Sequence, residues 1–171
     1  MALKPNQALL LAIDSNVALD FADECDEVID SLTTIRNRLR ECTICAPPTV
    51  VLELGHAADF GESSEKRAAA RKFLQLHRAW KFRLVHFVPA GQAQIISIAD
   101  RLRAQGLMPE DEVNDSLILA ESALLGCSML LTSDEHLRGI DFQRLTLELQ
   151  TFDAATPVIA TPREIVRKFF R

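Results

Sequence analysis

Apolar and polar positions form blocks along this chain, in which short continuous apolar runs alternate with longer amphipathic stretches. Residues 9–13 are apolar throughout, which is typical of a strand buried on both faces. Residues 26–40 instead place apolar side chains at helical spacing, with acids early and arginines late, as the helix dipole favours. Comparable patterns predict further strands at residues 43–46, 82–88, 129–131 and 158–159, and further helices at residues 49–60, 64–80, 89–105, 109–125, 135–138 and from residue 162.

Strands that alternate with helices are typical of a parallel sheet covered on both faces. Residues 145–149 fit neither element class clearly. We therefore expect a single α/β domain over residues 1–171, with three α/β/α layers around a central parallel sheet of four to five strands.

Four carboxylates fall where such a sheet binds ligands, outside the carboxyl ends of its strands. Asp14 directly follows the run at residues 9–13, and Asp134 follows the run at residues 129–131. Glu53 lies one turn into the helix after the second strand, and Asp115 lies in the helix before the Asp134 strand. We expect all four to converge on one cleft.

A cluster of carboxylate oxygens favours Mg²⁺ or Mn²⁺ over zinc. Glu53 strengthens this expectation, because it stands among apolar residues and a buried carboxylate is costly unless it is paired or bound to metal. The polar neighbours of the two strand-end acids are expected to support the metal ligands or contact substrate. These neighbours are Ser15, Asn16, Thr132 and Ser133.

Several polar residues near the predicted site also have a simpler, structural interpretation. Asp14 and Asn16 fit a turn or helix cap, and Glu53 fits the exposed side of an apolar helix. Glu110, Asp111 and Glu112 are interpreted as helix-start acids rather than as auxiliary metal ligands. His136 is more typical of partly buried structure than of a phosphate contact.

Charge and cysteine content change this picture little. The formal net charge of −5 would fall to −1 with two bound divalent cations, so the acidity does not exclude a polyanionic substrate. Cys42 and Cys45 have the spacing of a zinc motif but lack a second close pair, and we interpret the cysteines as reduced thiols. The longest apolar run, residues 8–13, is too short to cross a membrane, and a cytoplasmic location is expected.

Residues 114–123, followed by Gly126 and by residues 130–134, resemble a motif of PIN-domain ribonucleases, a family that includes VapC-like toxins. In this motif an aspartate opens a helix, and a glycine, a short strand and Thr-x-Asp follow. Residues 13–17 resemble the family's first acidic motif, and residues 48–54 its second. The four motifs occur in the family's order.

This resemblance implies a metal-dependent endoribonuclease that hydrolyses RNA phosphodiester bonds, with Asp14, Glu53, Asp115 and Asp134 as catalytic metal ligands for Mg²⁺ or Mn²⁺. It further implies that the chain could be the toxin of a toxin–antitoxin pair, with a protein antitoxin or inhibitor as partner, and that the chain forms a homodimer. Two alternatives stay open: a catalytically silent module of the same fold that binds RNA or protein, and a metal nuclease that acts on DNA.

Overall fold

The computed structural model describes residues 8–39 and 41–169. Within these residues, five parallel strands form one sheet in the order β3-β2-β1-β4-β5. The strands are β1 (Leu9–Ile13), β2 (Cys42–Ala46), β3 (Phe82–Leu84), β4 (Met129–Leu131) and β5 (Val158–Ala160). The expectation of a central parallel sheet of four to five strands is confirmed.

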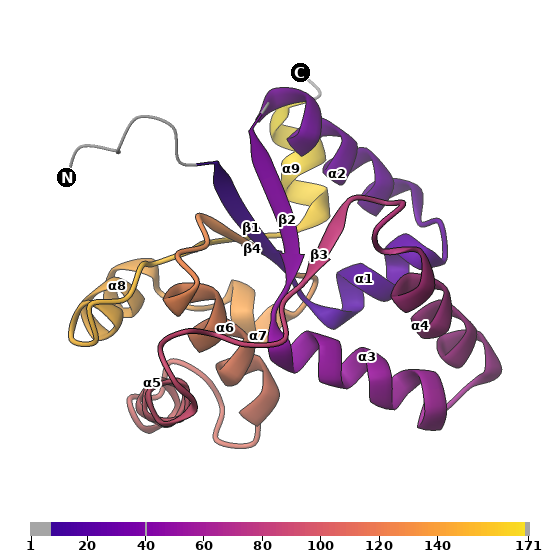
Figure 1. Cartoon of the computed structure of the whole chain (residues 1–171). Helices are drawn as coiled ribbons and strands as arrows, with labels where there is room; N and C mark the ends of the chain where they lie inside the picture. The colour runs from indigo at the N-terminus through magenta and orange to yellow at the C-terminus, as the bar shows by residue number, and fades with distance from the viewer. Residues whose placement is uncertain (1–7, 40, 170–171) are drawn as a thin grey trace.

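Helices flank the sheet in two groups, which Figure 1 shows on its two sides. The first group contains α1 (Ser15–Ala22), α2 (Asp26–Arg38), α4 (Ser64–Leu76) and α9 (Pro162–Phe169). The second contains α5 (Gln92–Ala104), α6 (Val113–Leu124) and α8 (Phe142–Gln150). Helix α3 (Pro48–Phe60) contacts α1, α4 and α6, and the short α7 (Glu135–Arg138) packs near β5.

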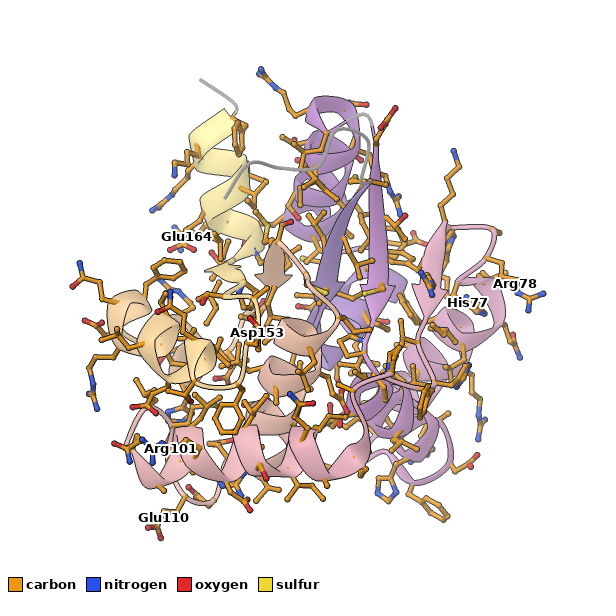
Figure 2. All side chains as sticks on the ribbon, turned by 60° about the vertical axis from the view of Figure 1, so that its left-hand side comes forward. His77, Arg78, Arg101, Glu110, Asp153 and Glu164 are labelled. Atoms are coloured by element: carbon orange, nitrogen blue, oxygen red, sulfur yellow. The ribbon has the colours of Figure 1, made fainter. Side chains whose placement is uncertain are left out.

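The core lies between the sheet and these helices. Leu11, Ala12 and Ile13 of the central strand β1 are buried, as are Leu130 and Leu131 of the neighbouring β4. Figure 2 shows charged side chains such as those of Arg78 and Glu110 on the outside of the molecule. The continuous apolar runs therefore correspond to strands covered on both faces.

Several predicted boundaries were wrong. The helix expected at residues 26–40 ends at Arg38, and residue 40 lies outside the described residues. The strand expected at residues 82–88 ends at Leu84, which pairs with Ala46, the last residue of the neighbouring β2.

The start of α6 and two whole helices also differ from the sequence expectation. Helix α6 begins at Val113 rather than near residue 109, because a tight turn precedes it and Val113 donates its N–H to the Asp111 carbonyl at 2.8 Å. Helix α1 was not predicted, and α8 fills the stretch that had fitted neither class. Within the described residues, no helix is both long and apolar enough to cross a membrane.

Candidate active site

The register of the two central strands places Asp14 beside Thr132. Strands β1 and β4 are neighbours, and Ile13 lies opposite Leu131. Asp14 donates its N–H to the Leu131 carbonyl at 3.1 Å, so the chain leaves both strands at the same edge of the sheet. There the Thr132 hydroxyl donates a hydrogen bond to the Asp14 carboxylate.

Asp14 caps a helix and is a buried carboxylate that is unfavourable to ionise. Its side chain caps the N-terminus of α1 by accepting a hydrogen bond from the Val17 N–H at 2.7 Å. The residue is only 3% exposed. Burial raises the pKa of Asp14 to about 6, against the opposing effect of hydrogen bonds from Thr132, Val17 and Ser133, and the nearby Asp134 raises it slightly more.

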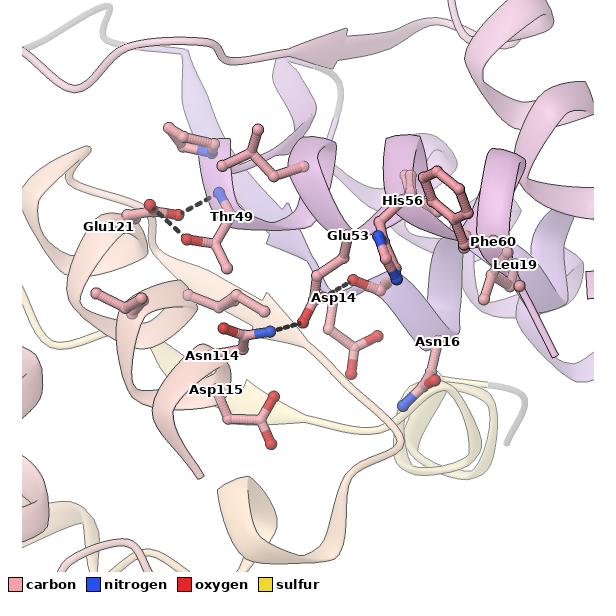
Figure 3. A pocket seen from close by; sticks show the side chains of 18 of the residues that line it. Asp14, Asn16, Leu19, Thr49, Glu53, His56, Phe60, Asn114, Asp115 and Glu121 are labelled. Atoms are coloured by element: carbon pink, nitrogen blue, oxygen red, sulfur yellow. Dashed lines mark hydrogen bonds between the residues drawn. The ribbon is translucent and has the colours of Figure 1, made fainter. Parts of the chain in front are cut away.

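Glu53 projects from the middle of α3 and is held by two polar neighbours from other helices. Its carboxylate accepts hydrogen bonds from the Ser15 hydroxyl in α1 and from the Asn114 side-chain amide in α6, the latter at 2.8 Å (Figure 3). Glu53 is half-buried, so the expectation of an apolar environment holds only in part. These hydrogen bonds connect α1, α3 and α6 at the site.

Asp115 lies in the first turn of α6 and is the most perturbed acid of the group. Burial raises its pKa to about 7, and the negative charges of Asp134, Glu112, Glu53 and Asp14 raise it further. These contributions all act in the same direction. The predicted acids therefore share one electrostatic field, in which ionised Asp115 is repelled by its neighbours.

Asp134 has a different local role. It caps the N-terminus of α7, accepting hydrogen bonds from the N–H groups of His136 and Leu137 at 2.7 and 3.1 Å. Its own N–H donates to the Thr132 hydroxyl at 2.9 Å. Asp134 is thus connected to Asp14 through Thr132.

Most of the predicted site residues line one cavity of about 740 Å³. Asp14, Glu53 and Asp115 line it together with Ser15 and Asn16, as Figure 3 shows for the labelled residues. The lining does not include Asp134, Thr132 or Ser133, which lie beyond its edge. Over residues 8–39 and 41–169, no three His, Cys, Asp or Glu side chains form a preassembled group of metal ligands.

The residues nonetheless fit a hard divalent cation. Carboxylate oxygens are the preferred ligands of Mg²⁺ and Mn²⁺. An added positive charge would offset the burial and the repulsion that raise the pKa values of Asp14 and Asp115. Both Asp14 and Asp115 line the cavity, where a bound cation would contact their negative charges. Glu53 accepts one hydrogen bond on each carboxylate oxygen, and each oxygen keeps a further lone pair for a metal ion.

Glu121 was not among the predicted site residues, although it is the most buried glutamate near the site at 3% exposed. Its carboxylate accepts hydrogen bonds from the Thr49 N–H and hydroxyl at 2.9 and 2.8 Å (Figure 3). The contact satisfies a free N–H at the start of α3 and fixes α3 against α6. Glu121 stands among apolar residues in the sequence, as Glu53 does, and this pattern could have identified it.

Two polar residues around Asp115 also matter more than the sequence indicated. Asn114 bonds Glu53, and Glu112 raises the pKa of Asp115. The Glu112 carboxylate also lies 3.6 Å from Nε2 of His136. Glu112, interpreted from the sequence as a helix-start acid, therefore belongs to the same charge cluster.

Comparison with known proteins shows the fold. Neither a protein-family model nor a curated protein sequence matches the chain. Among solved structures, the chain is similar to one described as VapBC2 from Rickettsia felis bound to a DNA fragment from their promoter, with a TM-score of 0.61 and 16% sequence identity. The similarity covers 90% of this chain and 98% of that one. The fold is PIN-like.

Proposed function

We propose that this protein is a metal-dependent endoribonuclease that hydrolyses RNA phosphodiester bonds in the cavity lined by Asp14, Glu53 and Asp115. The observation that carries the proposal is that three carboxylates line one cavity, and that two of them, Asp14 and Asp115, are costly to ionise there. Burial and neighbouring acids raise the pKa values of Asp14 and Asp115 to about 6 and about 7. Such an arrangement is costly for stability and is typical of functional sites that bind a cation.

Asp14, Glu53, Asp115 and Asp134 would hold Mg²⁺ or Mn²⁺. The chemistry supplied by such a bound ion is polarisation of the phosphoryl group, a hydroxide nucleophile at neutral pH and stabilisation of the leaving oxygen.

The remaining polar residues would position these acids. Thr132 orients the Asp14 carboxylate, and Ser15 and Asn114 orient Glu53. Asn16 lines the cavity and is exposed, so it can donate a hydrogen bond to an RNA phosphate. Ser133 is exposed next to Asp134 and can do the same from the other side.

We further propose that the activity is that of a toxin controlled by a protein antitoxin, and that two copies of the chain associate. The similarity to the VapBC2 structure supports the first part. Exposed apolar residues on several elements, such as Leu147, Val158 and Phe169, give surface that a protein partner could cover. Light scattering of the purified chain measures its association directly.

Cleavage of pooled transfer RNA and short structured RNAs tests the enzymatic part. The purified protein is incubated with Mg²⁺, Mn²⁺ or EDTA, and a single-stranded DNA of matched sequence is run in parallel. Asp115→Asn and Asp14→Asn remove one site charge each. Asp30→Asn is the matched control, because Asp30 is an exposed aspartate on α2 outside the cavity.

Cleavage of RNA that requires metal, survives in Asp30→Asn and is lost in both site variants would support the proposal. Cleavage of DNA alone would replace RNA by DNA as substrate. If no nucleic acid is cut and calorimetry detects no binding of Mg²⁺ or Mn²⁺, the proposal is overturned in favour of a silent binding module.

A further inference from the structure

One end of the carboxylate cavity is built from aromatic side chains rather than acids. His56 and Phe60 lie on the same face of α3 as Glu53, and all three line the cavity. Figure 3 shows the His56 and Phe60 rings on one side of Glu53 and Asp115 on the other. Seven residues along a helix separate Glu53 from Phe60, which corresponds to about 10 Å along the axis.

The two rings form a small exposed surface. Their centroids are 5.1 Å apart with an angle of 38° between the planes, and Phe60 is 72% exposed. A phenylalanine this exposed gains little from the core, so burial does not explain its position. The exposed side chain of Lys66 lines the same end of the cavity and adds a positive charge, although Glu62 lies there too.

The local fold fixes the backbone next to this surface. Phe60 is the last residue of α3, and the chain turns at Gly61, where a Cβ would lie 2.5 Å from the Ala57 carbonyl oxygen. The Gly61 carbonyl accepts a hydrogen bond from Arg67 at 2.6 Å, and Ser63 caps α4 through the Lys66 N–H at 3.1 Å. The backbone positions that carry Phe60 and Lys66 are therefore held on either side of a tight helix–helix turn.

We propose that His56 and Phe60 form a stacking platform for an unpaired base of a single-stranded RNA whose neighbouring phosphate lies at the carboxylate end of the cavity. This inference rests on the proposed function and specifies its substrate as unpaired RNA. Unpaired bases stack on Phe and His rings, whereas bases inside a duplex are not available for it. Lys66 attracts the backbone next to the stacked base.

A protein partner is the other occupant that an exposed phenylalanine suggests. The position of the rings favours RNA, because the platform is continuous with the cavity that holds Asp14, Glu53 and Asp115. A purely apolar partner would have to desolvate Lys66, Glu62 and the carboxylates without compensating them.

Binding of two single-stranded oligomers of about 12 units tests the platform. One is RNA, and the other has the same number of phosphates but abasic units in place of nucleotides. Stopped-flow fluorescence anisotropy in Mg²⁺ reads binding before any product accumulates, so the result does not depend on cleavage. Phe60→Ala removes the ring, Phe60→Trp keeps an aromatic surface, and Phe87→Ala is the matched control, since Phe87 is 71% exposed and lies outside the cavity lining.

We expect Phe60→Ala to weaken binding of the base-containing RNA on the order of tenfold and to leave binding of the abasic oligomer unchanged. Phe60→Trp and Phe87→Ala should both bind RNA as the wild type does. Equal losses for the two oligomers, no loss in Phe60→Ala, or no RNA binding by the wild type would each overturn the platform. Loss of self-association in Phe60→Ala with unchanged RNA binding would assign the surface to a second copy of the chain instead.

The cleavage assay separates this inference from the proposed function. An enzyme that cuts RNA in a metal-dependent way but binds RNA equally well with Phe60→Ala has the proposed activity without the platform. A protein that shows the base-dependent binding but cuts nothing has the platform without the activity. Circular dichroism of each variant checks that the exposed substitution leaves the fold intact.

Discussion

The Thr132 hydroxyl donates a hydrogen bond to the carboxylate of Asp14, and both residues are buried. The same hydroxyl accepts a hydrogen bond from the Asp134 N–H at 2.9 Å. Two of the four predicted site acids are therefore held in a fixed relation by one threonine at the edge of the sheet.

Thr132→Val tests the connection with little change in side-chain shape. It leaves the Asp134 N–H without its acceptor and the buried Asp14 carboxylate without one donor, so we expect a loss of about 1–3 kcal/mol in the free energy of unfolding. Urea denaturation measures this loss. Thr132→Ser, which keeps the hydroxyl, should lose clearly less, and equal stability of the two variants would show that the hydrogen bond does not matter.

Asp115→Asn should stabilise the protein at neutral pH in EDTA, in contrast to most substitutions at a buried position. Within residues 8–39 and 41–169, the Asp115 carboxylate accepts no hydrogen bond that the change would remove. Its charge is disfavoured by burial and is repelled by Asp134, Glu112, Glu53 and Asp14. Because the residue is partly exposed, solvent screening reduces the gain to about 1 kcal/mol, or about 2–4 °C in Tm. Differential scanning fluorimetry measures the change against Asp30→Asn, and an unchanged or lower Tm of Asp115→Asn would contradict the expected repulsion.

The difference between wild type and Asp115→Asn should also depend on pH. The pKa of Asp115 is raised in the folded state from 3.8 to about 7, so between these values the folded protein binds more protons than the unfolded one. Stability therefore falls as pH rises through this range, and Asp115→Asn lacks this fall. In EDTA the two proteins should have similar Tm values near pH 4 and diverge up to pH 7; a constant difference would be evidence against a raised pKa.

Mg²⁺ or Mn²⁺ should raise the Tm of the wild type, since a ligand that binds only the folded state stabilises it. At about a hundredfold excess over Kd the gain is about 2.7 kcal/mol, or about 5–10 °C for a domain of this size. The shift should be small below pH 6, where protons compete for Asp14 and Asp115. Asp14→Asn should reduce the shift and Asp30→Asn should keep it, whereas an equal shift in all three proteins would place the ion elsewhere.

Glu121→Ala should destabilise the fold and weaken activity without touching the reacting groups. It leaves the buried Thr49 N–H and hydroxyl without their acceptor, at a cost of about 1–3 kcal/mol, and loosens α3 relative to α6. Glu121 is thus a positioning residue for Glu53. Chemical denaturation together with the metal dependence of cleavage checks this, because Glu121→Ala should need more Mg²⁺ for half-maximal cleavage. The exposed substitution Glu27→Ala, in the first turn of α2, should lower the free energy of unfolding by only about 0.3–1 kcal/mol and leave the Mg²⁺ requirement unchanged.

The sequence by itself determined the elements whose pattern is local. The continuous apolar runs of β1 and β4 were located with their observed bounds, because strands buried on both faces need apolar side chains at every position. The rule that ligands gather at the carboxyl ends of parallel strands then placed Asp14 and Asp134 at one edge. It also placed Glu53 and Asp115 on the helices that reach this edge, where the structure has them.

Only the tertiary structure decided how these residues meet. Helix α1 begins because the Asp14 side chain caps it, and the position of Asp14 in turn depends on Thr132, 118 residues away along the chain. The pairing of Glu121 with Thr49 and the exposure of Phe60 beside the carboxylates likewise depend on contacts between distant segments. Periodicity reports which face of an element is buried, whereas hydrogen bonding and charge repulsion depend on distances that packing alone sets.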